Sequence, residues 1–412
     1  MSNYYSWTIG CQMNKAESER IASSLEQAGH TLSQTPDDAD VIVLNSCVVR
    51  QSAETRIVNK IRSLKPMKQL HPDKLLAVTG CLVNSDTGHL QKTFPYVNYF
   101  FKPGALPPWV ATPASVLPAQ PSPGIYIPII QGCDNFCAYC IVPFRRGREK
   151  SRPLAEIVCE VQEVVRRGTK EVTLLGQNVD SYGHDLTDKP DLAGLLEELN
   201  AIDGLARIRF LTNHPKDMSD RLTDAIARLD KVCEHLNLPV QSGSNEILQA
   251  MRRGYTVEQY RALVARIREK VPEIALSTDV IVGFPSETNE QFQETANFLA
   301  EVRFDTVHVA AYSPRPGTIA ARELEDNVPP KEKKSRLTAI EKLQEKIATG
   351  INAGLFGKTV EVLVDGQNKG KWQGRTRSDK LVFFSDKNDY FGKLVNVMVE
   401  KTSPWSLQGK IA

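Results

Sequence analysis

Three cysteines in one short segment have the residue type and the spacing to bind a metal centre together. Cys133, Cys137 and Cys140 follow the pattern C-x3-C-x2-C, directly after an expected strand over Ile125–Gln131. Three thiolates suit a cubane iron–sulfur cluster in which one iron stays open for a small molecule. The spacing differs from that of ferredoxins, so we predict a reactive cluster. A structural zinc site is the alternative, although zinc usually binds paired C-x2-C motifs and this segment has only one such pair.

Three further cysteines share a context, because each follows a segment that is strand-like in sequence. Cys11, Cys47 and Cys81 end the segments 4–10, 40–46 and 75–80, and helical patterns lie between them at Asn14–Ala28 and Ser52–Leu64. Alternating strands and helices predict a parallel sheet, whose strands have their carboxyl ends at one edge. We therefore predict that these cysteines converge on a second three-thiolate cluster. Three unrelated buried cysteines are the alternative.

The composition is that of an ordinary globular protein with two or three domains. The chain has 412 residues, of which 41% are hydrophobic and 24% are charged. No run is long and apolar enough to span a membrane, and the first residues lack a secretory signal, so we expect a cytoplasmic protein. The net charge of +2 does not by itself indicate nucleic-acid binding. Any RNA contact must therefore come from local basic patches.

The middle of the chain alternates strand-like and helix-like segments, after a proline-rich linker near 113–124. The expected strands are Ile125–Gln131, Glu171–Gly176, Arg207–Leu211, His235–Val240, Leu276–Val282 and Thr306–Tyr312. The expected helices between them include Leu154–Arg167, Leu192–Leu199, Arg221–Leu229, Val257–Lys270 and Asn289–Val302. Polar residues recur at the ends of successive strands, as at the active face of a βα barrel. His214 is more readily explained as a structural residue than as a catalytic one, and Asp279 within an apolar strand must be paired or functional.

The last part of the chain changes character after a charged helical pattern over Pro329–Thr349. Short strand-like segments at Thr359–Val364, Gln373–Thr376, Lys380–Phe384 and Val395–Val399 predict a small β-barrel. Lys371, Arg375 and Arg377 lie close in sequence to Trp372, and this mixture suits RNA binding, since basic groups bind phosphates and aromatic rings stack on bases. The aromatic residues are equally compatible with a role in the core.

These motifs resemble known families in every part of the chain. The loop from Cys133 to Cys140, with Tyr139 before its last cysteine, resembles the signature of the radical S-adenosylmethionine (SAM) superfamily. Gly10-Cys11-Gln12-Met13-Asn14, Asn45-Ser46-Cys47, Gly80-Cys81 and the segment from Ile141 to Arg152 resemble the methylthiotransferases, and the Cys-Gln-Met-Asn sequence resembles their tRNA-modifying MiaB branch. Gly374-Arg375-Thr376 and the ending from Trp405 to Gly409 resemble the TRAM domain, an RNA-binding module. Ser46 replaces the usual threonine of the family, and Leu82-Val83-Asn84 replaces the usual Met-Ala-Gln.

The resemblance implies a fold of class α/β in three parts. These are a parallel α/β domain over 1–112, a partial (β/α)6 radical SAM barrel over 125–348 after the linker at 113–124, and a small TRAM β-barrel over 349–412. It implies two [4Fe-4S] clusters and SAM as cofactors, with Cys133, Cys137 and Cys140 as catalytic residues. The expected cluster ligands are Cys11, Cys47, Cys81, Cys133, Cys137 and Cys140, and the expected cofactor-binding residues are Tyr139, Gln177, Asn178, Gln241 and Asp279.

The implied reaction is methylthiolation of C2 of N6-isopentenyladenosine at position 37 of tRNA, with sulfur delivered at the second cluster. The implied partners are the tRNA anticodon stem-loop and a reducing electron donor of the flavodoxin or ferredoxin type, with no membrane and a monomeric chain. The candidate RNA-binding residues are Lys371, Arg375, Arg377, Arg146 and Arg148. The alternative substrates are N6-threonylcarbamoyladenosine in tRNA and an aspartate of a ribosomal protein. A non-enzymatic iron–sulfur protein that binds RNA or transfers electrons is the alternative of a different class.

Overall fold

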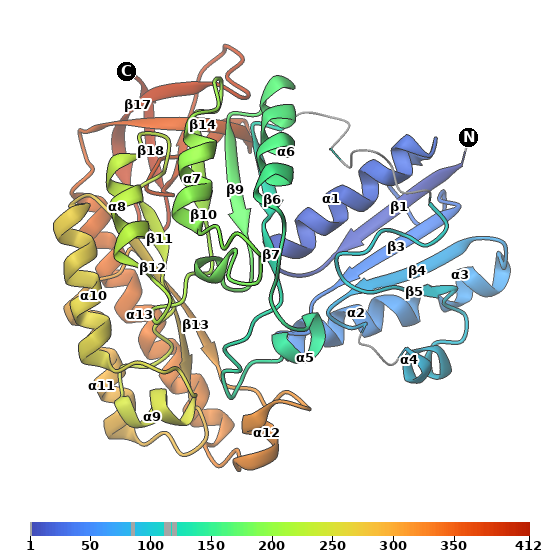
Figure 1. Ribbon diagram of the computed structural model, residues 1–412, viewed down its shortest axis with the longest axis horizontal. Coiled ribbons are helices and arrows are strands. Elements are labelled where there is room, and N and C mark those ends of the chain that lie inside the picture. The colour runs from blue at the N-terminus through green and yellow to red at the C-terminus, as the bar shows by residue number, and fades with distance from the viewer. Residues whose placement is uncertain (1, 84–86, 111–116, 118–121) are drawn as a thin grey trace.

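A computed structural model of the chain describes residues 2–83, 87–110, 117 and 122–412. Most of the expected proline-rich linker, namely 113–116 and 118–121, lies outside these residues. Figure 1 shows an amino-terminal sheet on one side of the molecule, a central set of strands surrounded by helices, and a small barrel at the carboxyl end. In the part of the chain that is described, no helix has the length and apolar character needed to cross a membrane.

The amino-terminal part is a parallel sheet in the strand order β2-β1-β3-β4-β5. Its strands are β1 (Asn3–Thr8), β2 (Thr31–Leu32), β3 (Val41–Ser46), β4 (Leu75–Gly80) and β5 (Tyr99–Phe100). Its helices are α1 (Gln12–Gln27), α2 (Gln51–Ser63), α3 (Lys65–Leu70) and α4 (Gly88–Thr93). The predicted parallel α/β arrangement is confirmed.

The central strand β3 explains why this sheet has helices on both faces. All six of its residues are buried, as expected of a parallel strand covered on both sides. Val41 and Val43 pack with the α1 residues Ile21 and Leu25 in one apolar cluster. The alternate residues of β3 pack with α2 in another cluster. The period of two along the strand therefore divides its side chains between α1 and α2.

The central part is an open barrel of parallel strands formed from two sheets, β6-β9-β10 and β11-β12-β13. An isolated parallel bridge joins Ile208 to Val232, which lies three residues before the first strand of the second sheet. The strands are β6 (Gly124–Pro128), β9 (Glu171–Leu175), β10 (Arg207–Phe210), β11 (His235–Asn237), β12 (Ala275–Val282) and β13 (Thr306–Ala311). Strand β7 (Ile130–Gln131) pairs with β8 (Lys150–Ser151) next to the cysteine segment. This arrangement confirms the predicted partial (β/α)6 barrel.

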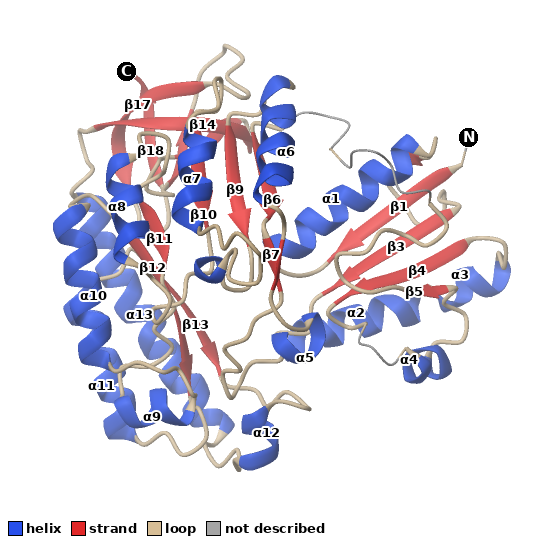
Figure 2. Ribbon diagram, in the orientation of Figure 1, coloured by secondary structure: helices blue, strands red, loops and turns tan. Residues whose placement is uncertain are grey.

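Helices cover the outside of the open barrel (Figure 2). They are α6 (Leu154–Arg166), α7 (Leu192–Asn200), α8 (Asp220–Arg228), α9 (Asn245–Ala250), α10 (Val257–Lys270) and α11 (Asn289–Val302). The remaining short elements are α5 (Val142–Arg146), the 3-10 turn η1 (Val179–Ser181) and α12 (Ile319–Glu323). Helices α10 and α11 both begin with a capping box, formed by Thr256 with Gln259 and by Thr288 with Gln291. These caps satisfy the first backbone N–H groups of each helix and so fix where it begins.

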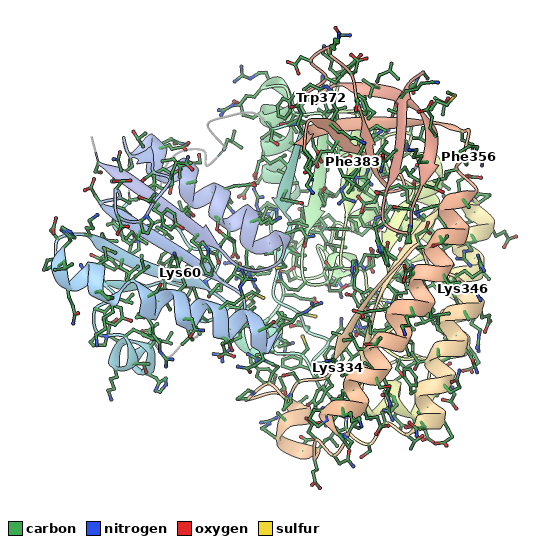
Figure 3. All side chains as sticks on the ribbon, turned by 180° about the vertical axis from the view of Figure 1, so that it is seen from behind. Lys60, Lys334, Lys346, Phe356, Trp372 and Phe383 are labelled. Carbon is green, nitrogen blue, oxygen red and sulfur yellow. The ribbon has the colours of Figure 1, made fainter. Side chains whose placement is uncertain are left out.

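The carboxyl-terminal part is a closed barrel in the order β14-β15-β16-β18-β17, which confirms the predicted small barrel. Its strands are β14 (Thr359–Asn368), β15 (Lys371–Arg375), β16 (Leu381–Phe384), β17 (Leu394–Thr402) and β18 (Leu407–Ile411). The long helix α13 (Pro330–Ala353) leads into it along the central barrel, and Figure 3 shows Lys334 and Lys346 along this helix and Trp372 and Phe383 in the small barrel. Trp372 is buried in the core of this barrel.

Two buried arginines on β10 join the central barrel to the small one. The Arg207 guanidinium donates to the carbonyl of Arg375 at 2.8 Å and to Glu361 Oε1 at 2.8 Å. The Arg209 guanidinium donates to the carbonyl of Thr376 at 2.6 Å and to that of Arg377 at 2.8 Å. Since burying a guanidinium without partners is costly, these contacts make the small barrel a structural part of the central one.

Candidate metal centres

The segment that carries Cys133, Cys137 and Cys140 is a loop between β7 and α5. Gly132, with a φ of +84°, turns the chain into the loop, and its N–H donates to Gln177 Oε1 at 2.6 Å. Further along the loop, the N–H of Ala138 donates to the carbonyl of Met251 at 2.9 Å. The loop is thus held from two sides, by the end of β9 and by the segment after α9.

The thiols of this loop are close enough to influence one another electrostatically. Burial, together with the neighbouring Cys137 and Cys133, raises the pKa of Cys140 to about 12. Burial also raises the pKa of Cys133 to about 11. The buried Arg253 guanidinium donates to Cys137 Sγ at 3.3 Å, and a cationic donor at this distance stabilises a thiolate. The loop therefore offers three neighbouring sulfur ligands beside a positive charge.

The other three cysteines follow β1, β3 and β4, and the sheet brings them to one edge. Burial raises the pKa of Cys47 to about 11, with additional contributions from Cys81 and Cys11. Cys11 and Cys81 also line the same cavity. Cys47 and Cys81 are buried and Cys11 is exposed. The predicted convergence of the three thiols is therefore present in the fold.

A network of polar side chains fixes this edge of the sheet. Asn14 Nδ2 donates to Asn45 Oδ1 at 2.9 Å and to the carbonyl of Ser46 at 3.0 Å. Ser46 Oγ donates to the carbonyl of Thr79 at 2.7 Å and accepts from the N–H of Leu82 at 3.1 Å. The serine that replaces the usual threonine thus keeps its hydroxyl in use. These bonds connect the chain next to each of the three cysteines.

The residues present fit a cubane cluster at each group of cysteines. Each group offers three thiols, and a cubane with three protein ligands binds each thiolate to a different iron. Within the described residues, no three His, Cys, Asp or Glu side chains lie close enough together to hold a single metal ion. A cubane does not require such a grouping, because its three thiolates bind three different irons. Each group also has an arginine N–H at one of its sulfurs, and such outer donors orient ligands and tune iron–sulfur sites.

The arginine beside the amino-terminal group comes from the central barrel. Arg146 on α5 donates from Nε to Cys81 Sγ at 3.3 Å and from Nη1 to Glu17 Oε1 at 2.6 Å. Burial by itself would lower the pKa of Arg146, but Cys81 and Glu17 more than offset it, so the pKa is raised. Arg146 is therefore a permanent cation in the interior. Its buried position does not support the predicted contact with RNA.

A cavity of about 630 Å³ extends from the amino-terminal cysteines through the open barrel to the small barrel. Its walls include Cys11 and Cys81 at one end and Lys380 and Trp405 at the other. Small-molecule sites typically have volumes of about 300–1,000 Å³. The cavity is therefore large enough for a nucleoside or a cofactor, and all three parts of the chain line it.

The predicted cofactor-binding residues lie around the barrel mouth with different partners. Gln177 and Asp279 line the cavity, and Asp279 Oδ2 accepts from Asn237 Nδ2 at 3.1 Å. Asn178 Nδ2 donates to Asp217 Oδ2 at 2.7 Å. Gln241, with a φ of +71°, makes a backbone bridge to Val280, and Tyr139 packs in the apolar cluster under the loop. Their contacts with a cofactor stay a prediction.

His214 is a buried neutral residue beside these groups. Burial, with Arg253 and Lys216 nearby, lowers the pKa of His214 to about 2. Burial raises the pKa of the adjacent Asp180 to about 7, although Asp180 accepts bonds from the His214 N–H at 2.8 Å and from Asn213. This setting agrees with a structural role for His214, because its imidazole stays uncharged at neutral pH.

The candidate RNA-binding residues divide by exposure. Arg148, Lys371 and Arg375 are exposed, and their contact with RNA stays a prediction. Arg377 is half-buried and forms an ion pair with Glu234 at 2.7 Å, across the junction of the two barrels. In this structure Arg377 therefore serves the docking of the small barrel.

Two residues of these sites were not identified from the sequence. Glu17, which binds Arg146, lies on α1 four residues from both Met13 and Ile21, which are buried. An acidic residue on the apolar face of a helix was the available signal. Arg253, which donates to Cys137, follows α9 and carries no comparable signal, because only the fold brings it to the loop.

Comparisons with known families match all three parts of the chain. Residues 127–299 match the radical SAM superfamily, residues 3–102 match the uncharacterized protein family UPF0004, and residues 355–412 match the TRAM domain. Radical SAM proteins bind a [4Fe-4S] cluster and SAM, which accounts for the cysteine loop. A solved radical SAM methyltransferase, TsrM from Kitasatospora setae, has a TM-score of 0.55 at 14% identity and covers 78% of this chain and 77% of its own. This likeness shows the fold.

Curated relatives match over essentially their whole length. The tRNA-2-methylthio-N(6)-dimethylallyladenosine synthase of Dehalococcoides mccartyi is 54% identical over 412 residues, which are 100% of this chain and 99% of the relative. The protein of the same name from Chloroflexus aurantiacus is 49% identical and covers 98% of this chain and 91% of its own. With two thiol groups, a radical SAM barrel and a TRAM barrel in the same order, this chain belongs to the tRNA-2-methylthio-N(6)-dimethylallyladenosine synthase family of radical SAM methylthiotransferases.

Proposed function

We propose that this protein transfers a methylthio group to C2 of N6-dimethylallyladenosine (isopentenyladenosine) at position 37 of tRNA. The observation that carries the proposal is the 54% identity to a synthase named for this product, which spans both cysteine groups and the small barrel. The relatives favour this substrate over threonylcarbamoyladenosine and over a ribosomal-protein aspartate. They also favour an enzyme over a protein that only binds RNA or transfers electrons.

The reaction needs radical chemistry, because the C2–H bond of an adenine offers no acidic proton to a base. The two clusters and SAM, when bound, supply that chemistry together with the sulfur and the methyl group. The chain supplies position: Gln177 holds the first residue of the cysteine loop, and Arg253 donates to Cys137. The cavity between the three parts gives the adenine a site from which water can be excluded.

We assign Cys133, Cys137 and Cys140 to the radical SAM cluster and Cys11, Cys47 and Cys81 to a second [4Fe-4S] cluster. The second assignment is supported by the convergence of its three thiols at one sheet edge and by the Arg146 donor at Cys81. Cys11 and Cys81 line the cavity, which suits delivery of sulfur to a base held there. Iron and sulfide analysis of anaerobically reconstituted protein should give about eight irons per chain.

The TRAM domain and the tRNA-modifying relatives suggest that the protein binds tRNA. We infer that the anticodon stem-loop meets the exposed basic residues Lys371, Arg375 and Arg148. The radical SAM cluster requires reduction, so we also infer an electron donor of the flavodoxin or ferredoxin type. We further propose that the protein is monomeric and cytoplasmic. Its domains are proposed to span 1–112, 125–348 and 349–412.

The decisive test is complementation of a bacterial strain that lacks its own synthase of this type. Mass spectrometry of tRNA nucleosides should show the 2-methylthio derivative of N6-dimethylallyladenosine when the intact chain is expressed. Cys137→Ala and Cys11→Ala should both abolish this product. Cys159→Ala is the matched control, because Cys159 is exposed on α6 outside both groups. A strain that instead gains a methylthio group on threonylcarbamoyladenosine, or gains none, would contradict the proposed substrate.

A further inference from the structure

Arg146 connects the two cysteine groups. It lies on α5, six positions after Cys140, yet its guanidinium reaches Cys81 of the other group. Its Nη1 and Nη2 donate to the two oxygens of Glu17 at 2.6 and 3.3 Å, and its Nε donates to Cys81 Sγ at 3.3 Å. The side chain is therefore fixed by bonds from three of its nitrogens.

The geometry leaves little freedom for this guanidinium. Only 2% of the Arg146 side chain and 6% of the Glu17 side chain are exposed. A bidentate carboxylate fixes the plane of the guanidinium, and the third N–H then points to one sulfur. Lysine could not reproduce this arrangement, because its ammonium lacks the planar fork of donors.

The arginine at the other cysteine group has different partners. Arg253 contacts Cys137 Sγ, the hydroxyls of Tyr139 and Tyr255, and the carbonyl of Pro239. Among the described residues, its hydrogen-bond and ion-pair partners include no carboxylate. The charge of Arg146 is balanced by Glu17, whereas that of Arg253 is not balanced in this way. Substitution of Arg146 therefore removes a positive charge near Cys81, and substitution of Glu17 removes a negative one.

We propose that Arg146 is a positioning residue that orients Cys81 and raises the reduction potential of the iron–sulfur cluster bound at Cys11, Cys47 and Cys81. A donor at a ligand sulfur stabilises the extra negative charge of the reduced state, and hydrogen bonds to sulfur are among the terms that set cluster potentials. Glu17 holds Arg146 in place and, through its own negative charge, limits the increase in the reduction potential. The proposal rests on the proposed function, because it requires the second cluster.

The test uses the full-length chain with Cys133, Cys137 and Cys140 replaced by alanine, so that only the second cluster can assemble. Iron content and the visible spectrum first establish that this parent protein holds a cluster. Potentiometric titration monitored by electron paramagnetic resonance then gives the midpoint of its one-electron reduction. At the midpoint of the parent, Arg146→Gln should lower the ratio of reduced to oxidised cluster about tenfold, which corresponds to about 59 mV.

Two further variants separate tuning from a merely structural effect. Arg148→Gln removes a charge two positions away, from an exposed side chain that pairs with Asp134, and should leave the midpoint unchanged. Glu17→Gln removes the balancing carboxylate and should raise the midpoint. Shifts of opposite sign from Arg146→Gln and Glu17→Gln are the signature of the proposal. Shifts in the same direction, or an unchanged midpoint in Arg146→Gln, would overturn it.

The outcomes also distinguish this inference from the proposed function. A parent protein that binds no iron would remove the second cluster, and both proposals would fail. A parent protein with a cluster whose midpoint ignores the Arg146 and Glu17 substitutions would refute only the role of Arg146. If Arg146→Gln takes up no iron, Glu17→Gln decides the matter, and a midpoint that stays constant or falls in that variant counts against the proposal.

Discussion

The two cysteine groups offer the same set of three thiols, but the chain brings the thiols together in different ways. Cys133, Cys137 and Cys140 lie within eight residues of one loop, so their proximity is a local property of the chain. Cys11, Cys47 and Cys81 come from the ends of β1, β3 and β4 and meet only because those strands are parallel neighbours. The arrangement of the first three thiols should therefore depend on the conformation of one loop. The arrangement of the second three should depend on the strand register of a whole sheet.

In both groups, nevertheless, a glycine with a positive φ precedes one of the cysteines. Gly132 and Gly80 immediately precede Cys133 and Cys81, with φ values of +84° and +87°. A Cβ at Gly132 would lie 2.1 Å from the carbonyl oxygen of Arg148, and one at Gly80 would lie 2.3 Å from that of Ser46. In each case the backbone packs against backbone, which only glycine permits.

The largest expected effects come from removing one buried ligand of each group. Cys137→Ala should abolish formation of 5′-deoxyadenosine from SAM, because the loop then lacks one of its three thiolates. Cys47→Ala should retain that product and abolish only methylthio transfer. Each variant should hold about four irons instead of about eight. Chromatography of reaction products and iron analysis of the same samples provide the measurement.

The exposed Cys159 supplies the control for this pair. Cys159→Ala should keep the iron content and both products. Loss of 5′-deoxyadenosine in Cys47→Ala would mean that the two groups do not act separately, and the contrast drawn between them would not hold.

A smaller effect of the same pattern is expected from alanine at the two glycines. Gly132→Ala should impair the loop group and the formation of 5′-deoxyadenosine, whereas Gly80→Ala should impair the sheet-edge group alone. Both substitutions force a clash with backbone, so each should lower the free energy of unfolding by more than the roughly 1 kcal/mol of a left-handed backbone strain. Thermal unfolding and iron analysis of the same preparations measure both consequences.

Gly168→Ala is the matched substitution, because Gly168 has a φ of +108° but a Cβ at that position would meet no atom within 4 Å. It should show the strain without loss of iron. Equal iron loss in all three glycine variants would show that backbone strain, and not the close approach next to a cysteine, causes the defect.

The pH dependence of stability should be alike in the two groups, since burial raises the pKa of both Cys47 and Cys133 from 9.0 to about 11. In metal-free protein between pH 9 and 11, the unfolded chain loses these protons while the folded chain keeps them. The unfolded state then binds fewer protons, so stability falls as pH rises, by on the order of 2 kcal/mol for each thiol. Below pH 9 both states are protonated, and these thiols contribute no slope.

Urea unfolding of metal-free protein at pH 8 and pH 10.5 measures this loss. Cys47→Ser and Cys133→Ser should each flatten the pH dependence to a similar degree. If only one of the two variants had a flatter pH dependence of stability, the environments of the two thiols would differ.

The smallest effect concerns the hydroxyl that connects β3 to the segment after β4. Ser46→Ala removes its bonds to the carbonyl of Thr79 and the N–H of Leu82, and should cost about 1–2 kcal/mol because a buried N–H loses its partner. Ser46→Thr keeps the hydroxyl and should cost less. Chemical denaturation ranks the two variants, and an equal cost would show that the site responds to volume and not to hydrogen bonding.

The sequence predicted the regular elements of the fold well because their patterns are local. The strand over Leu276–Val282 appears as Ala275–Val282, and the helix over Val257–Lys270 has the same bounds in the structure. Strand β18 (Leu407–Ile411) was missed, because its sequence has little apolar alternation and its pairing with β16 and β17 comes from barrel closure. The short helices α9 and α12 were also missed, since so few residues carry no clear periodicity.

The candidate sites were predictable to the extent that strand ends indicate a common edge. That rule brought Cys11, Cys47 and Cys81 together from the order of strands and helices alone. It could not place Arg146, which was predicted to contact RNA and whose burial depends on the docking of two domains. It also could not find Arg253 at Cys137, because that contact joins residues 116 positions apart.

The two buried arginines of β10 have a consequence for the order in which the chain can mature during synthesis. Arg207 and Arg209 find their hydrogen-bond acceptors in the small barrel 154 to 168 positions later. The carboxylate of Glu171 on the neighbouring strand lies 3.8 Å from Arg207 and 3.0 Å from Arg209, and it is the partner that the central barrel itself provides for both cations. We therefore expect this end of the central barrel to remain incomplete in a nascent chain until the residues of the small barrel have been made.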